Sequence, residues 1–152
     1  MEADVAIPLP SVYFSPCGGC TAAIVAAVTA ARCTVLVSAY EFTSSEIASA
    51  LLAARSAGAS VQLILDPTQR YQHGSQSHLL SISNIPVLYD PCHAIYHDKF
   101  MVIDSRFVIT GSFNYTPAAE FHNAENLIFV DSPQIAALYA ANWLAHKAHS
   151  VA

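Results

Sequence analysis

Four polar side chains near the middle of the sequence have the types and spacing needed to handle a phosphate group. His97 and Lys99 are two residues apart, and so are Ser112 and Asn114. In a strand, side chains two residues apart project from the same face, so each pair points in one direction. A lysine and an asparagine can hold the non-bridging oxygens of a phosphate, and a histidine can act as a nucleophile or an acid near neutral pH. Together the two pairs indicate a phosphate site.

The residues between these pairs predict a β-hairpin. Two apolar runs, 100–103 and 107–110, are separated by a polar segment, 104–106, that can form a tight turn. A hairpin brings the residues before its first strand beside the residues after its second strand. We therefore expect the two polar pairs to lie side by side around one small pocket.

The spacing of six residues in this region resembles the signature motif of the phospholipase D superfamily. These residues are His97, Lys99, Asp104, Gly111, Ser112 and Asn114. Further segments, among them 14–16, 39–43 and 123–126, resemble the small branch with a single signature, which includes the bacterial Nuc-type endonucleases. The resemblance covers residues 11–150. It implies an α/β sandwich that hydrolyses phosphodiesters without a metal or any other cofactor.

The resemblance also implies a second subunit. The family's chemistry needs two histidines: one attacks the phosphorus to form a phosphohistidine, and the other protonates the leaving oxygen and then activates water. This chain carries a single signature and therefore a single His97. We expect a two-fold homodimer with both motifs at its axis. Lys99 and Asn114 of both subunits would then bind phosphate oxygens, with Ser112 adding a hydrogen bond.

Three further residues are expected to support this site. Glu125 is expected to hold the distal nitrogen of the His97 imidazole and so fix its tautomer, as acids do in catalytic triads. Asp104 and Gly111 belong to the signature, and Asp104 follows an apolar run at a strand turn. For these two we expect a structural role.

Two residues outside the signature are candidate substrate contacts. Arg70 lies in a polar loop, 68–77, and is either a second phosphate contact or an ordinary solvated arginine. His93, on the loop before the signature, is expected at the rim of the pocket. The other five histidines are expected at the surface: His73, His78, His122, His146 and His149.

The cysteines suggest a zinc site only weakly. Cys17 and Cys20 are separated by two residues, and Cys92 with His93 could supply the other half of a site. The second pair lacks the spacing of a zinc knuckle, and no insertion that would carry one is present. We therefore predict no metal site. The sequence does not assign disulfide pairing among its four cysteines.

The charge of the chain is unusual for a protein that binds nucleic acid. Six Lys and Arg stand against eleven Asp and Glu, for a formal net charge of −5. Any DNA-binding patch must therefore be local. With 54% hydrophobic and 11% charged residues, some apolar surface is expected to meet another subunit. The longest near-apolar run, 22–31, is too short to span a bilayer.

Apolar runs and turn residues predict an α/β fold. Their alternation implies parallel strands joined by helices. We expect one domain, 1–152, with an irregular arm at 1–10, built on a mixed, largely parallel sheet with helices on both faces. Besides the hairpin, the expected strands are 12–14, 34–40, 61–65, 86–89 and 123–130, and the expected helices are 22–31, 43–56, 78–82, 116–122 and 132–149.

The leading hypothesis is a homodimeric, metal-independent endonuclease that hydrolyses DNA or RNA with little sequence preference. A phospholipase D-type hydrolase of phospholipids is the alternative, because its signature is identical. The lack of a basic amphipathic helix favours the nuclease. A non-catalytic phosphate-binding module would need a broken signature, and none of its residues is missing. No signal peptide is visible. The expected location is therefore either the cytoplasm or, after removal of a signal peptide, the periplasm or exterior of a bacterium.

Overall fold

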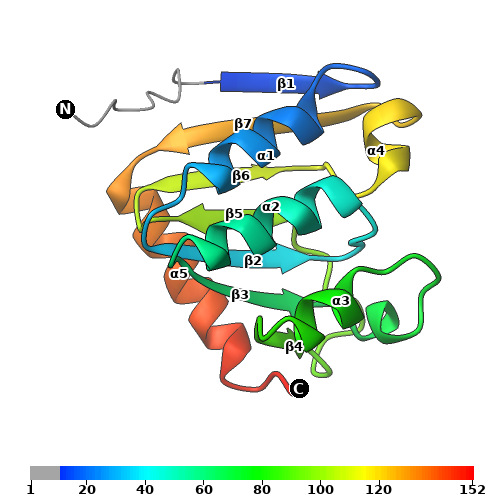
Figure 1. Ribbon diagram of the computed structural model, residues 1–152, viewed down its shortest axis with the longest axis vertical. Coiled ribbons are helices and arrows are strands. Elements are labelled where there is room, and N and C mark those ends of the chain that lie inside the picture. The colour runs from blue at the N-terminus through cyan, green and yellow to red at the C-terminus, as the bar shows by residue number, and fades with distance from the viewer. Residues whose placement is uncertain (1–10) are drawn as a thin grey trace.

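A seven-stranded sheet runs through the molecule in the order β1-β7-β6-β5-β2-β3-β4 (Figure 1). The computed structural model describes residues 11–152, so the irregular arm predicted for 1–10 lies outside the described residues. The strands are β1 (Ser11–Ser15), β2 (Thr34–Ala39), β3 (Ser60–Leu65), β4 (Val87–Tyr89), β5 (Phe100–Ile103), β6 (Phe107–Gly111) and β7 (Glu125–Asp131). The helices are α1 (Cys20–Thr29), α2 (Ser45–Ser56), α3 (Ser77–Ile82), α4 (Pro117–Phe121) and α5 (Pro133–Lys147), with a short 3₁₀ helix, η1 (Pro67–Arg70).

The sheet is mixed, but most of its strand pairs are antiparallel. The β2–β3 and β3–β4 pairs are parallel, whereas the other four pairs are antiparallel. The α/β sandwich with helices on both faces is confirmed, but the expectation of a largely parallel sheet is wrong. The neighbouring strands β2, β3 and β4 are joined in chain order by helical crossovers, which parallel pairing requires. The strands β5, β6 and β7 instead lie beside one another in antiparallel order.

Helices cover both faces because the central strands alternate apolar side chains toward each side. The helices α1 and α2 lie on one face, and α5 lies on the other (Figure 1). Val37 of β2 and Ile24 of α1 belong to the core of the first face. Val102 of β5 and Trp143 of α5 belong to the core of the second. The Trp143 indole N–H also donates to the carbonyl oxygen of Val37 at 3.0 Å, which fixes α5 against β2.

Three helices begin at the capping residues that the sequence offers. The side-chain oxygens of Ser44, Thr116 and Ser132 accept the N–H groups of Ile47, Ala119 and Ile135, at the starts of α2, α4 and α5. The predicted bounds of every strand and α-helix lie within two residues of the observed ones, whereas the 3₁₀ helix η1 was not predicted. None of the helices found between residues 11 and 152 is long and apolar enough to cross a lipid bilayer.

Candidate active site

The β5–β6 hairpin brings the two ends of the predicted motif together. Phe100 pairs with Thr110, so Lys99, just before β5, lies beside Gly111, the last residue of β6. The Thr110 hydroxyl donates to the Lys99 carbonyl oxygen at 3.5 Å. The expected hairpin is therefore confirmed, and its open end carries the polar residues of both strands.

A cavity of about 400 Å³ lies at this end of the hairpin. The hairpin contributes six lining residues and α5 contributes three. They are His97, Asp98, Lys99, Phe100, Thr110, Gly111, Leu138, Tyr139 and Asn142. The α5 residues could not be found by sequence reasoning, because nothing in the sequence links positions 138–142 to His97.

His97 is exposed and is contacted by two neighbouring side chains. Lys99 Nζ lies 3.2 Å from His97 Nδ1 and donates to the His97 carbonyl oxygen at 2.7 Å. The Tyr40 ring packs against the imidazole. Burial lowers the pKa of Lys99 below its ordinary value, although the carboxylates of Glu125, Asp98 and Glu41 act in the opposite direction. The ammonium and the imidazole are therefore held together at the cavity.

Ser112, which is exposed, and Asn114, which is half-buried, follow β6 and alternate with the buried Phe113 and Tyr115. Tyr115 is anchored by its N–H, which donates to the Glu41 carbonyl oxygen at 3.2 Å. The Asn114 Oδ1 atom is buried and has no hydrogen-bond partner within the part of the chain that the structure describes. Unpaired buried polar atoms are uncommon in proteins and require an explanation, such as a ligand.

Glu125 lies at the start of β7 and contacts serine rather than histidine. Its carboxylate accepts the Ser112 hydroxyl and, at 3.3 Å, the Asn123 side-chain amide. The expected hydrogen bond from Glu125 to His97 is not formed among residues 11–152. The physical reason is the strand order: β7 is separated from β5 by β6, and two strand spacings are about 10 Å.

Asp104 and Gly111 hold the strands in place. The Asp104 carboxylate, at the closed end of the hairpin, accepts the N–H groups of Arg32, Cys33 and Thr34 at 2.9, 2.7 and 2.9 Å. It thereby ties the turn to the start of β2. A Cβ atom at Gly111 would lie 2.2 Å from the Asn126 carbonyl oxygen, so no side chain fits there.

Arg70 and His93 do not line the cavity. The Arg70 guanidinium lies 4.0 Å from the centre of the Tyr89 ring and donates to the Ala152 carbonyl oxygen. His93 Nδ1 lies 2.9 Å from Asp90 Oδ2. A contact of either residue with substrate stays a prediction.

Sequence reasoning missed a cluster of four side chains where the loop after β4 meets the end of α5. Its members are Asp90, His93, His146 and His149. His146 and His149, which were expected at the surface, are only partly exposed, and both approach the fully buried Asp90 carboxylate. Burial alone would raise the pKa of Asp90, but hydrogen bonds from His149, the Cys92 N–H, His146 and His93 bring it below its usual range. The available signal was the spacing of three residues within each pair, at the end of α5 and in the loop after β4.

Comparisons with known proteins agree with the fold. A family model described as "Cardiolipin synthase, PLD-like domain" matches residues 24–146. A protein named phospholipase D from Rickettsia bellii is 39% identical over 140 residues, which cover 92% of this chain and 70% of the relative. A human mitochondrial cardiolipin hydrolase is 29% identical over 129 residues, covering 82% of this chain and 51% of that protein.

Two solved structures are similar over nearly their whole length. Nuc from Salmonella typhimurium, described as a phospholipase D family member, superposes with a TM-score of 0.89 and 30% identity, covering 93% of this chain and 95% of that one. NucT from Helicobacter pylori gives a TM-score of 0.83 and 21% identity, covering 93% and 97%.

Proposed function

The chain belongs to the phospholipase D superfamily of hydrolases. We propose that it is a metal-independent phosphodiesterase that cleaves nucleic acid, DNA above all. The single observation that carries the proposal is the open end of the β5–β6 hairpin. There His97 and Lys99 line one cavity, and Ser112 and Asn114 follow the adjacent strand. An imidazole beside an ammonium is suited to attack and hold a phosphate.

The proposed reaction proceeds in two displacements. His97 of one subunit forms a bond to phosphorus while the bond from phosphorus to the leaving oxygen breaks, and that oxygen takes a proton from His97 of a second subunit. Water then attacks the phosphohistidine and gives a proton to the second His97 as the phosphorus–nitrogen bond breaks. Because each chain carries one such histidine, the reaction calls for a homodimer with the two cavities facing each other.

Lys99 and Asn114 are proposed to bind the non-bridging oxygens. The Lys99 ammonium already lies beside the imidazole, so it faces the position of the phosphorus. Asn114 would donate its side-chain N–H₂ to a non-bridging oxygen, whereas its buried Oδ1 is an acceptor and would take a hydrogen bond only from a donor group. Glu125 is proposed to act through Ser112, whose hydroxyl it accepts, and through its charge near Lys99.

Two features support a nucleic-acid substrate. His97 is exposed, so a phosphate in the middle of a polymer can reach it without being threaded through a channel. The similarity to Nuc extends over 95% of that chain. The sequence resemblance to the Nuc-type endonucleases points to the same substrate class.

A phospholipid substrate is the second candidate, and one observation favours it. Leu138 lines the cavity and is 72% exposed, and Tyr139 lies next to it. These side chains could contact an acyl chain or a glycerol backbone. The names of the Rickettsia and mitochondrial relatives are in accordance with this reading.

A side-by-side assay separates the two candidates. The purified chain is incubated in EDTA with plasmid DNA, with RNA, and with vesicles of phosphatidylcholine or cardiolipin. We expect cleavage of DNA in EDTA, and a loss of roughly a thousandfold or more in His97→Ala. The exposed His78, which lies outside the cavity, provides the matched control, His78→Ala. Cleavage of vesicles alone would favour the phospholipase, and strict dependence on Mg²⁺ would overturn the mechanism.

A further inference from the structure

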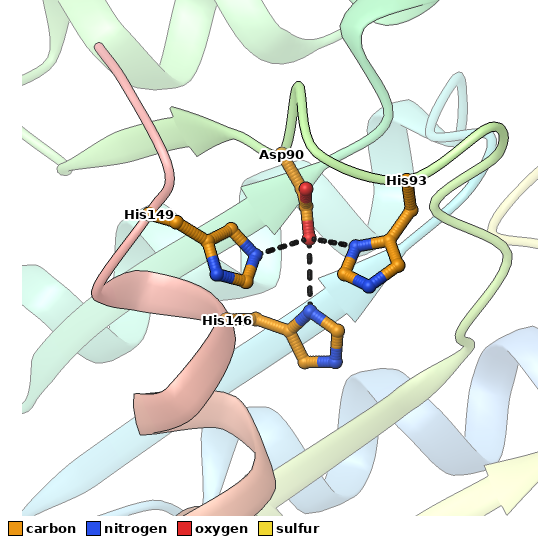
Figure 2. Close-up of side chains that lie close together, drawn as sticks. All are labelled: Asp90, His93, His146 and His149. Atoms are coloured by element: carbon orange, nitrogen blue, oxygen red, sulfur yellow. Dashed lines mark hydrogen bonds and ion pairs between the residues drawn. The ribbon is translucent and has the colours of Figure 1, made fainter.

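Four side chains from two distant parts of the sequence converge at the end of α5. Figure 2 shows His146 and His149 approaching from the end of that helix and His93 from the opposite loop, with Asp90 between them. Asp90 Oδ2 lies 2.9 Å from His93 Nδ1, 2.8 Å from His146 Nδ1 and 3.0 Å from His149 Nε2. These four atoms all lie within 4.8 Å of one another.

Hydrogen bonding alone does not account well for this arrangement. A carboxylate oxygen offers about two lone-pair positions, yet three imidazole nitrogens approach the same Oδ2 atom. The other oxygen, Oδ1, already accepts the Cys92 N–H at 2.8 Å. At least one of the three nitrogens therefore has no lone-pair position left on Oδ2 to which it could donate.

The charge of Asp90 raises the same difficulty. Its side chain is fully buried, and a buried carboxylate requires a compensating charge. Within residues 11–152, no lysine or arginine forms an ion pair with it, and its only ionisable partners are the three imidazoles. The imidazoles balance the carboxylate only when one of them is protonated, whereas a cation among the four ligand atoms would balance it with all three imidazoles neutral.

We propose that Asp90, His93, His146 and His149 bind a divalent transition-metal ion, with zinc as the ion that the set fits best. Zinc binds imidazole nitrogen and carboxylate oxygen at about 2.0–2.2 Å, so neighbouring ligands of a tetrahedral ion lie roughly 3.3 Å apart. The observed separations of the oxygen from the nitrogens are slightly shorter. All four atoms lie within 4.8 Å of one another, so binding an ion would draw the more distant pairs of ligand atoms together and move the oxygen slightly away from the nitrogens.

The ligand types select the class of ion. Mg²⁺ and Ca²⁺ prefer sites made of oxygen, whereas three imidazoles favour zinc, copper, nickel or cobalt. Four protein ligands fill a tetrahedral zinc site, which is typical of structural rather than catalytic zinc. The Cys92 N–H, which binds the other carboxylate oxygen, would hold the Asp90 side chain in its ligating orientation. The prediction of no metal considered the cysteines, and this set contains none of them.

The location of the site suggests what the ion does. The Tyr96 ring packs edge-on against the His146 ring, with centroids 5.2 Å apart, and Tyr96 immediately precedes His97. The Tyr96 N–H donates to Asp66, and its hydroxyl bonds to Ser38. An ion that joins residues 90–93 to the end of α5 would therefore stabilise the loop that carries His97. The ion would stabilise the fold and would take no part in catalysis, so this proposal does not depend on the proposed function.

Metal content and metal-dependent stability test the proposal. The full chain, without a histidine tag, is dialysed against EDTA and then against metal-free buffer, and ZnCl₂ is titrated into it by calorimetry. We expect one zinc per chain, a rise in Tm on zinc addition, and no rise with MgCl₂. With CoCl₂ we expect the visible absorption of tetrahedral cobalt, which an adventitious surface ion in octahedral coordination does not give.

Two variants make the result specific to these residues. His149→Gln removes one partly exposed ligand and should lose most of the zinc affinity and the zinc-induced rise in Tm. His78→Gln removes an exposed histidine outside the cluster and should retain both. The proposal is overturned if the wild-type chain binds no stoichiometric zinc, or if His149→Gln binds it as tightly as the wild type. Nuclease activity is not a readout here, so its absence would count only against the proposed function.

Discussion

The ring of Tyr40 packs against the imidazole of His97, with centroids 4.7 Å apart and planes inclined by 50°. The Lys99 ammonium lies 5.5 Å from the centre of the same Tyr40 ring. Tyr40 therefore contacts both groups that are proposed to act on the phosphate. It lies just after β2, and sequence reasoning gave it no role in the site.

Replacement of Tyr40 should reduce turnover without abolishing it. Aromatic contacts are worth about 0.5–1.5 kcal/mol, so Tyr40→Ala should lower kcat on bis(p-nitrophenyl) phosphate by roughly two- to tenfold. Tyr40→Phe keeps the ring and should retain the wild-type rate. If Tyr40→Phe is as slow as Tyr40→Ala, the hydroxyl rather than the ring is the important group.

The alkaline limb of the pH profile should depend on Glu125. A lysine is charged below its pKa, so activity should fall as the pH rises through the lowered pKa of Lys99. Glu125 is the strongest of the carboxylates that oppose this lowering. Glu125→Gln should therefore move the alkaline limb to lower pH, whatever it does to the maximal rate. Glu41→Gln, which removes a weaker influence, should move it less. A limb that stays in place in Glu125→Gln would contradict this assignment.

A mixing experiment should reveal whether two subunits share one active site. Wild-type chain and His97→Ala are co-refolded in equal amounts, and activity is compared with the same total amount of wild type. If each site needs two His97 residues, about a quarter of random dimers are active, whereas independent subunits retain about half. We expect the lower value. Wild type mixed with His78→Ala serves as the control and should show no loss.

Asp104 should contribute to stability rather than to chemistry. Its carboxylate accepts three backbone N–H groups at the end of the hairpin opposite to His97. Asp104→Ala should lower the free energy of unfolding in urea by about 2 kcal/mol, because hydrogen bonds to a charged group are lost. Asp104→Asn keeps an acceptor and tolerates the positive φ of 52°, so it should lose less. Below the unfolding transition both should keep wild-type kcat, and a large loss of kcat would show a direct role.

The sequence was most informative where function and fold depend on neighbouring residues. The strand–turn–strand pattern predicted the hairpin correctly, and the two-residue spacing of Ser112 and Asn114 agrees with the burial of Phe113 and Tyr115 between and after them.

Long-range relationships were not accessible in the same way. The antiparallel pairing of β5 with β2 and of β7 with β6 depends on how the chain crosses between strands, and the cluster around Asp90 depends on α5 returning to the loop after β4. Nothing local to His146 specifies that Asp90 lies beside it. The distance of Glu125 from His97 was missed for the same reason, because it follows from the position of β6 between their strands.

The four cysteines should differ sharply in reactivity. Cys17, Cys33 and Cys92 are exposed free thiols, whereas Cys20 is completely buried. Burial, followed by the nearby carboxylates of Glu120 and Glu125, raises the pKa of Cys20 to about 11. Since the thiolate is the reactive form, iodoacetamide at pH 8 should modify three cysteines in the native chain and the fourth only after unfolding in urea. Peptide mass spectrometry identifies the protected residue. Rapid modification of Cys20 in the native chain would mean that the start of α1 opens readily, and that the burial of this helix is weaker than the packing indicates.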